Sequence, residues 1–219
     1  MTRIDIINGL IDKYDYQSYL EIGLDFADAF VRVRCKNKEC VDPYVYEEES
    51  DYVKNVRYYI EQNILTYKMT SDEFFEMIPA DKKYDIIFID GLHHEDQVGR
   101  DIINSLQHLN DGGTIVCHDC LPASYEVQVE GYHAPDETWN GSVWKAIPML
   151  KFQGIDYVTV DADYGCCVIQ YNGDKSILTY PQKADYNYGD VFGNTTIRNI
   201  MLNVISEERF NNFLNSTNE

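Results

Sequence analysis

The chain alternates between short apolar runs and longer segments in which apolar residues recur every three or four positions. Short apolar runs bounded by turn residues are typical of buried strands, and the longer spacing is typical of amphipathic helices. The pattern predicts strands at 18–24, 38–43, 64–69, 84–90, 114–119, 155–161 and 164–171. It predicts helices at 3–13, 26–33, 50–62, 70–78, 95–109, 142–150 and 197–215.

The order of these elements indicates how the strands run. Strands and helices alternate five times, and such alternation is typical of a mostly parallel sheet. The final two strands follow each other without a helix between them, which implies an antiparallel strand at one edge. Residues 1–175 are predicted to form one α/β domain, and residues 176–219 a C-terminal extension that packs on the same domain.

The formal net charge of −19 narrows the range of partners. Such a charge repels phosphate backbones and anionic membranes, so neither nucleic acid nor a membrane is an expected partner. The sequence has no apolar run of about 18 residues, and its charged N-terminal stretch is unlike a secretory signal. We therefore expect a cytoplasmic protein that acts on a neutral or cationic small molecule, either as a monomer or as a homodimer.

The six cysteines allow two interpretations. Cys35 and Cys40 could combine with Cys117 and Cys120 in a four-thiolate zinc site. Both pairs fall at strand ends and lack the turn residues of a zinc knuckle, so reduced core thiols are the favoured interpretation.

Polar residues recur at the end of nearly every predicted parallel strand. In an open parallel sheet, ligands bind outside the carboxyl ends of the strands, so these residues are candidates for one shared site. In chain order they are Glu21, Gly23, Asp42, Ser71, Asp72, Asp90, His93, His118 and Asp119.

The first two strand ends indicate a nucleotide-like cofactor. Gly23 would let a ligand approach the backbone closely. Asp42 follows Glu21 by 21 residues, which is the usual spacing for an acid that binds ribose hydroxyls. The segment has one glycine where dinucleotide sites usually show three, and Asp25 would repel a pyrophosphate. A cofactor with adenosine but without phosphates, such as S-adenosylmethionine, therefore fits better than a dinucleotide.

Several segments together carry a family resemblance: YLEIG, VDP, MTSDEFF, YDIIFIDGLHHEDQVGRDI, GGTIVCHDC and WNGSVWKAI. Over about residues 18–170 the chain resembles class I S-adenosylmethionine-dependent methyltransferases, closest to a branch of small-molecule O-methyltransferases often met beside sugar-processing enzymes. The resemblance implies a Rossmann-like, seven-stranded, mostly parallel sheet with an antiparallel last strand and helices on both faces.

The resemblance also implies roles in cofactor binding. Glu21 and Gly23 would border the methionine end of S-adenosylmethionine, and Asp90 would also contact the cofactor. Asp42 would bind the ribose, and Ser71 or Asp72 would lie near the adenine.

A hydroxyl acceptor needs a base, a metal ion or both, because it is a poor nucleophile near neutral pH. Asp90 and Asp119 end adjacent strands, so their carboxylates could converge on one cation. By its resemblance to metal-dependent sugar O-methyltransferases, the D-G-x-H segment implies His93 as the general base beside Asp90. The same resemblance implies Asp90, His118 and Asp119 as ligands of Mg²⁺ or Mn²⁺. Cys120 stands where catechol-type relatives have Asn.

Some of these residues also have purely structural interpretations. Asp42 could begin a turn, and Ser71 and Asp72 could cap the helix that follows them. Asp90 could cap the helix that begins near residue 95. Trp139 could stack on an acceptor or anchor the core. His133, a few residues before it, is a second and weaker candidate for the base.

Two other functions remain open from the sequence. One is an NAD-dependent oxidoreductase on a Rossmann-like sheet. The other is a non-catalytic protein that binds the cofactor without turning it over. The leading hypothesis is methyl transfer to a small hydroxylated acceptor that could contain a sugar.

Overall fold

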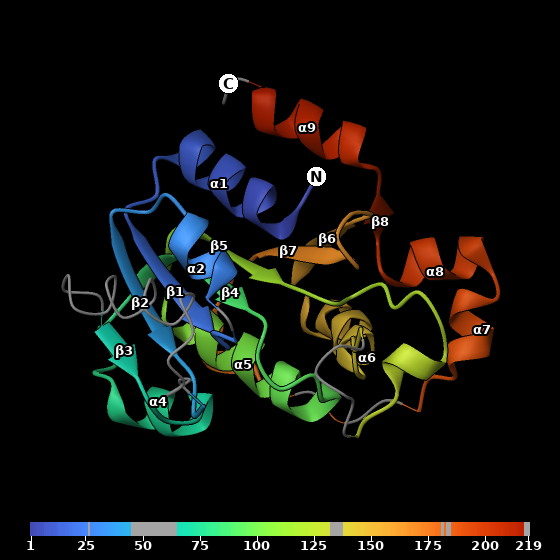
Figure 1. The fold of residues 1–219 in the computed structure, drawn as a ribbon, viewed down its shortest axis with the longest axis horizontal. Coiled ribbons are helices and arrows are strands. Elements are labelled where there is room, and N and C mark those ends of the chain that lie inside the picture. Colours follow the sequence, from blue (N-terminus) through green and yellow to red (C-terminus); the bar gives the residue numbers. More distant parts are fainter. Residues whose placement is uncertain (26, 45–64, 132–137, 181, 183–184, 217–219) are drawn as a thin grey trace.

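The protein folds around a single twisted sheet with helices on both faces (Figure 1). The computed structural model describes residues 1–25, 27–44, 65–131, 138–180, 182 and 185–216. Within them the strands are β1 (Ser18–Ile22), β2 (Asn37–Val41), β3 (Leu65–Tyr67), β4 (Tyr84–Ile89), β5 (Leu109–Cys117), β6 (Asp156–Val160), β7 (Cys166–Gln170) and β8 (Val204–Ile205). The sheet order is β3-β2-β1-β4-β5-β7-β6-β8.

The strands from β3 to β5 all run parallel, and β7 is antiparallel to both of its neighbours, β5 and β6. The predicted Rossmann-like α/β fold is therefore confirmed. Two details differ from the prediction. The antiparallel strand lies between β5 and β6 and not at the edge, and the described residues contain an eighth strand, β8, which pairs with β6.

Two helical layers cover the sheet. One face carries α1 (Arg3–Tyr14), α2 (Asp28–Arg32) and α9 (Glu207–Asn215), and the other carries α4 (Ser71–Met77), α5 (Glu95–Gln107) and α6 (Val143–Met149). Side chains alternate along each strand, so Leu20 packs toward α5 whereas Tyr19 packs toward α1. The short 3₁₀ helices are η1 (Glu126–Gln128), η2 (Leu150–Gln153) and η3 (Lys175–Ile177).

The C-terminal segment is more broken than its apolar spacing indicates. A single helix over 197–215 is predicted, but the chain forms α7 (Tyr188–Phe192), α8 (Thr195–Met201), β8 and α9. The break occurs at Asn203, which has a left-handed backbone (φ 48°) and whose amide donates to the carbonyl of Tyr157. Ser206 then caps α9 by accepting from the backbone N–H of Arg209. In Figure 1, α9 lies alongside α1, and Phe210 is buried in the same core as that helix.

Three further expectations concern the cysteines, membrane-spanning helices and the helix predicted at 50–62. All six cysteines are buried free thiols, as the core-thiol interpretation requires. In the part of the chain that the structure describes, no helix has both the length and the apolar character needed to cross a membrane. The helix predicted at 50–62 lies outside the described residues.

Candidate active site

The ends of β1, β4 and β5 meet at one edge of the sheet. The ladder continues one residue past each strand, because the N–H of Asp90 donates to the carbonyl of Ile22 at 2.8 Å and that of His118 to Ile89 at 3.0 Å. The strand order therefore brings the acid after β4 beside the His-Asp pair after β5, as the sequence predicts for carboxyl ends of neighbouring parallel strands.

Gly23 is required where β1 approaches the end of β4. Its φ is +87°, and a Cβ atom there would lie 2.2 Å from the carbonyl oxygen of Asp90. The prediction gave this glycine a role in ligand approach. In the structure its neighbour is the Asp90–Gly91 backbone, so packing alone explains the residue type.

His93 is fixed between a backbone carbonyl and two acids. Its Nδ1 lies 2.8 Å from the carbonyl oxygen of Trp139. Its Nε2 lies 3.4 Å from Oδ1 of Asp90 and 3.3 Å from Oδ2 of Asp119. Carbonyl and carboxylate oxygens can only accept hydrogen bonds. Nδ1 therefore carries a proton toward Trp139, and Nε2 carries a second proton toward the carboxylates when the ring is charged.

His118 approaches the same two acids. Its Nδ1 lies 3.2 Å from Oδ1 of Asp90 and 3.4 Å from Oδ2 of Asp119. Its Nε2 lies 3.7 Å from Oδ1 of Asp163. Arg3, at the start of α1, completes the group, with Nη1 3.3 Å from Asp163 and Nε 3.8 Å from Asp90.

The electrostatics of this cluster favour positive charge. Burial would lower the pKa of His118, but the negative charges of Asp90 and Asp119 outweigh it and raise that pKa well above its usual value. Burial likewise opposes the charged form of His93, yet Asp90 and Asp119 raise its pKa. The pKa of Asp163 falls to about 2, because the contacts with His118 and Arg3 outweigh its burial.

The same cluster has the donor atoms for a cation. One ligand atom from each of Asp90, His93 and Asp119 can be chosen so that all lie within 4.8 Å of one another. His118 faces the same carboxylate oxygens from a second direction. Carboxylates and imidazole suit Mn²⁺ or Mg²⁺. Nδ1 of His93 is held by the carbonyl of Trp139, whereas Nε2 of His118 lies 3.7 Å from Asp163 and has no hydrogen-bond partner among the described residues.

The acids predicted for cofactor binding lie near this cluster along β1 and β2. Asp42 follows β2 and accepts from the N–H of Leu24 at 2.7 Å and from the N–H of Tyr44 at 2.6 Å. Asp42 thus contacts the turn after β1 through Leu24. Its bond to Tyr44 also fits the structural interpretation, in which Asp42 begins a turn of its own. Glu21 is buried on the α1 side of β1 and accepts from the hydroxyl of Tyr19. Burial raises the pKa of Glu21 to about 8.

Ser71 and Asp72 contact α5. The Nε2 of Gln97 donates to Oγ of Ser71 at 3.1 Å and to Oδ1 of Asp72 at 3.2 Å. Arg100 adds an ion pair to Asp72 at 3.3 Å. Neither residue caps α4, because Thr70 occupies that position in a capping box. The residue at the N-terminal cap position of α5 is His94, so Asp90 does not cap that helix.

Three contributors to the site are absent from the predicted set: Arg3, Asp163 and Asn140. Asn140 donates from Nδ2 to Oδ1 of Asp119. Each comes from a segment far along the chain, and no local motif marks it. The sequence feature nearest to Asn140 that could have drawn attention to it is the preceding residue, Trp139. The ring centroid of Trp139 lies 5.0 Å from that of His93. His133, a weaker alternative for the base, lies outside the described residues.

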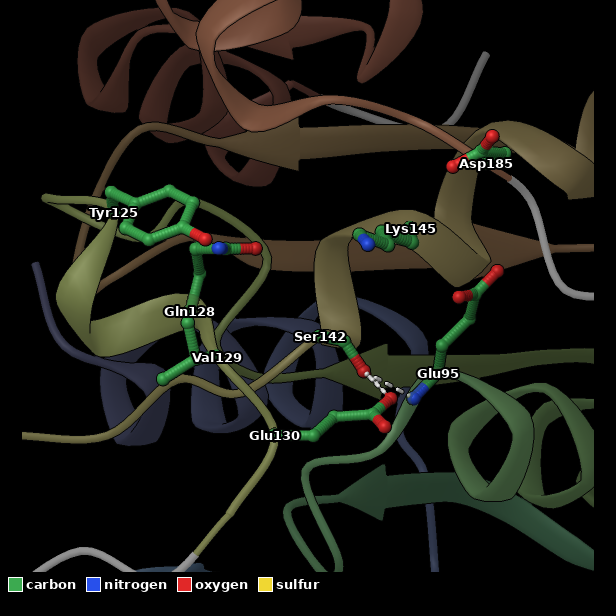
Figure 2. A pocket seen from close by; sticks show the side chains of 8 residues that line it. All are labelled: Glu95, Tyr125, Gln128, Val129, Glu130, Ser142, Lys145 and Asp185. Atoms are coloured by element: carbon green, nitrogen blue, oxygen red, sulfur yellow. Dashed lines mark hydrogen bonds between the residues drawn. The ribbon is translucent and has the colours of Figure 1, made fainter.

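A cavity of about 450 Å³ lies beside the segment 139–142 (Figure 2). Ser142 lines it, and its Oγ accepts from the N–H of Glu95 at 2.7 Å and donates to Glu130 at 2.5 Å. The N–H of Ser142 donates to the carbonyl of His93 at 2.9 Å, which links the cavity to the cluster. Lys145 and Asp185 line the same space, so its lining carries charges of both signs.

Residues 25–120 match a family model described as a methyltransferase domain. The matched region extends from the turn after β1 to the residue after Asp119, and it includes Asp42, Asp90, His93 and His118. No curated protein matches the chain.

Solved structures share the fold at low sequence identity. A Staphylococcus aureus protein assigned as a caffeoyl-CoA O-methyltransferase is 19% identical, with a TM-score of 0.56 over 77% of this chain and 82% of its own. The O-methyltransferase TomG from Streptomyces achromogenes, in complex with SAM, is 12% identical, with a TM-score of 0.54 over 77% and 79%. An O-methyltransferase from Bacillus cereus, in complex with SAH, is also 12% identical, with a TM-score of 0.53 over 77% and 80%.

Two findings bear on the class of this protein: the sheet with β7 inserted antiparallel between β5 and β6, and the methyltransferase domain match. The chain has the fold of solved O-methyltransferases, and its residues 25–120 match a methyltransferase domain. The fold and the domain match agree with the family expected from the sequence, the class I S-adenosylmethionine-dependent methyltransferases, and they disfavour the NAD-dependent alternative.

Proposed function

We propose that the protein transfers the methyl group of S-adenosylmethionine to an oxygen of a small hydroxylated acceptor, with His93 as the general base. The observation that carries the proposal is the orientation of the His93 ring. Its Nδ1 is held by the carbonyl of Trp139 at 2.8 Å, so Nε2 is the nitrogen available at the strand-end cluster. A buried imidazole with one fixed nitrogen is suited to take a proton from a hydroxyl once Nε2 has lost its own proton, and a cation held by Asp90 and Asp119 would favour that loss.

The proposed reaction needs little covalent help from the protein. S-adenosylmethionine supplies a methyl group that is already activated by the positive sulfur. The acceptor hydroxyl gives its proton to Nε2 of His93, its oxygen forms the new O–CH₃ bond, and the S–CH₃ bond breaks. The bonding pair stays on sulfur and leaves S-adenosylhomocysteine. The task of the chain is to align the acceptor and to accept the proton.

For the cofactor, we propose that the carboxylate of Asp42 binds the ribose hydroxyls. Its contacts with Leu24 and Tyr44 hold it at the end of β2, next to the turn after β1. Glu21 and Asp90 would flank the methionine end, and Ser71 or Asp72 the adenine, on the α4 side. These roles follow the resemblance residue by residue, and the proximity of Asp42, Gly23 and Asp90 supports them.

We further propose a divalent cation, Mn²⁺ or Mg²⁺, held by Asp90, Asp119 and His118. Two carboxylates and an imidazole facing one another support this set, and Asp163 lies next to the second nitrogen of His118. Such an ion would act as a Lewis acid and lower the pKa of an acceptor hydroxyl. The short distances from His93 to the same acids favour a second arrangement, in which His93 is itself a ligand.

The cavity beside Ser142 is the proposed acceptor site. Glu95, Glu130 and Lys145 bring charges of both signs to its lining, and Ser142 connects it to the backbone of His93.

Calorimetric titration with S-adenosylhomocysteine and NAD, followed by transfer of radiolabelled methyl to a panel of hydroxylated molecules that includes sugars, tests the proposal. We expect S-adenosylhomocysteine to bind, NAD not to bind, and the label to appear as a methyl ether. Binding of NAD alone would overturn the proposed function. Tight S-adenosylhomocysteine binding without transfer to any acceptor would support the non-catalytic alternative instead.

A further inference from the structure

Asn140 is buried against one of the acids of the cluster. Its side chain is fully buried, and its backbone N–H donates to the carbonyl of Val127 at 2.8 Å. The side-chain Nδ2 donates to Oδ1 of Asp119, while Oδ1 of Asn140 has no hydrogen-bond partner among the described residues. A buried acceptor without a partner destabilises a fold, so packing alone would be served better by a hydrocarbon side chain.

The contact decides which oxygen of Asp119 faces the imidazoles. With Oδ1 bound to Asn140, Oδ2 is the atom 3.3 Å from Nε2 of His93 and 3.4 Å from Nδ1 of His118. The terminal torsion of an aspartate is soft, and a partner is needed to fix it. The backbone of Asp119 is left-handed (φ 61°), which further restricts where this side chain can point.

The segment that carries Asn140 also holds His93. Trp139 accepts from its Nδ1, and the N–H of Ser142 donates to its carbonyl at 2.9 Å. Gly141 lies between them with φ +58°, and a Cβ atom there would be 2.0 Å from that same carbonyl oxygen. One four-residue segment, 139–142, therefore sets the position of both the proposed base and Asp119.

We propose that Asn140 is a positioning residue that keeps Oδ2 of Asp119 directed at His93 and His118, the residues that would serve as base and as cation ligand, an inference that rests on the proposed function. Its amide acts on the reaction only through Asp119. Loss of the amide would free the carboxylate to turn away from the two imidazoles. The affinity for Mn²⁺ and the turnover should then fall, whereas the affinity for the cofactor, which is expected to bind at β1 and β2, should not change.

Two variants and a matched control test this role. Asn140→Ala removes the donor, and Asn140→Asp keeps the shape while replacing the donor with an acceptor. Asn8→Ala is the control, because Asn8 is another buried asparagine, which donates to the carbonyl of Arg32 at 3.2 Å and accepts from the N–H of Arg34 at 2.8 Å. Each variant is compared for unfolding temperature, Mn²⁺ affinity by electron paramagnetic resonance, S-adenosylhomocysteine affinity and kcat.

We expect Asn140→Ala and Asn140→Asp to weaken Mn²⁺ binding and to lower kcat by about 10- to 100-fold each, with unchanged S-adenosylhomocysteine affinity. Asn8→Ala should lower only the unfolding temperature. Wild-type Mn²⁺ affinity and kcat in both Asn140 variants would overturn the inference, as would an Asp variant as active as the wild type.

The two readouts separate this inference from the proposed function. If the wild type binds Mn²⁺ but methylates no acceptor, the proposed function fails and the Mn²⁺ affinities alone decide the role of Asn140. If it methylates an acceptor without binding Mn²⁺, the metal site fails and kcat alone decides. A wild type that does neither overturns both.

Discussion

The backbone carbonyl of Trp139 lies 2.8 Å from Nδ1 of His93 and holds the ring so that its other nitrogen faces Asp90 and Asp119. A contact between two residues 46 positions apart thus sets which nitrogen of the imidazole is available for chemistry. Because the contact is made by a backbone atom, the identity of the side chain at position 139 matters less than the path of the segment.

Removal of the His93 imidazole should lower turnover far more than cofactor affinity. We expect His93→Ala to reduce kcat by roughly 100-fold or more, because the acceptor loses the group that takes its proton. His108→Ala is a matched control, since Nδ1 of His108 also meets a carbonyl oxygen, that of Lys82, at 2.8 Å, but at the far end of α5. A fully active His93→Ala enzyme would rule out His93 as the base.

Removal of the Asp42 carboxylate should weaken cofactor binding. We expect Asp42→Ala to cost about 1–3 kcal/mol in S-adenosylhomocysteine affinity, the usual cost of losing a charged hydrogen-bond partner. Asp85→Ala is the control, because Asp85 also accepts from backbone N–H groups, those of Gln17 at 2.8 Å and Ser18 at 3.0 Å, at the opposite end of β1. Calorimetry in which the two variants bind equally well would remove Asp42 from the ribose role.

Glu21 should make the fold less stable as the pH rises. Its pKa is raised by burial from 4.5 to about 8, so the folded state keeps a proton that the unfolded chain releases. The favourable contribution is complete below about pH 4.5 and is lost as the pH rises toward about 8. Glu21→Gln should abolish this part of the loss, on the order of 2–4 kcal/mol, in denaturant titrations without cofactor at pH 5 and pH 8.5. An identical pH dependence in both proteins would show that Glu21 is ionised in the folded state.

Removal of divalent ions should abolish methyl transfer. We expect a chelator to eliminate activity and Mn²⁺ or Mg²⁺ to restore it, because the acids of the cluster offer oxygen ligands to such ions. Asp119→Asn should require at least ten times more Mn²⁺ for half-maximal activity, by analogy with the usual effect of altering a metal site. Activity that is indifferent to the chelator would leave His93 as the base without metal assistance.

The sequence could predict the strand-end cluster, because the order of strands and helices indicates a parallel sheet and so indicates which residues lie at the carboxyl ends of its strands. Parallel strands end at the same edge, so Asp90 and Asp119 had to converge once their strands were known to be neighbours. The helical period could not predict the break at Asn203, because that break depends on a contact with Tyr157 that lies 46 residues away.

The remaining parts of the site depend on long-range packing. Arg3 and Asp163 are 160 residues apart and meet only after α1 has packed on the end of the sheet. Asn140 lies in a segment whose only conspicuous residue in the sequence is Trp139. No local signal states that its amide faces Asp119, and its role could be derived only from the hydrogen bond itself.

A crystal structure of the protein with S-adenosylhomocysteine and Mn²⁺ would test the central claim most directly. We predict anomalous density from Mn²⁺ between Asp90 and Asp119, ribose hydroxyls at Asp42, and the sulfur atom on the same side of the sheet edge as His93. A cofactor bound away from these three strand ends, or Mn²⁺ bound elsewhere on the surface, would contradict the account.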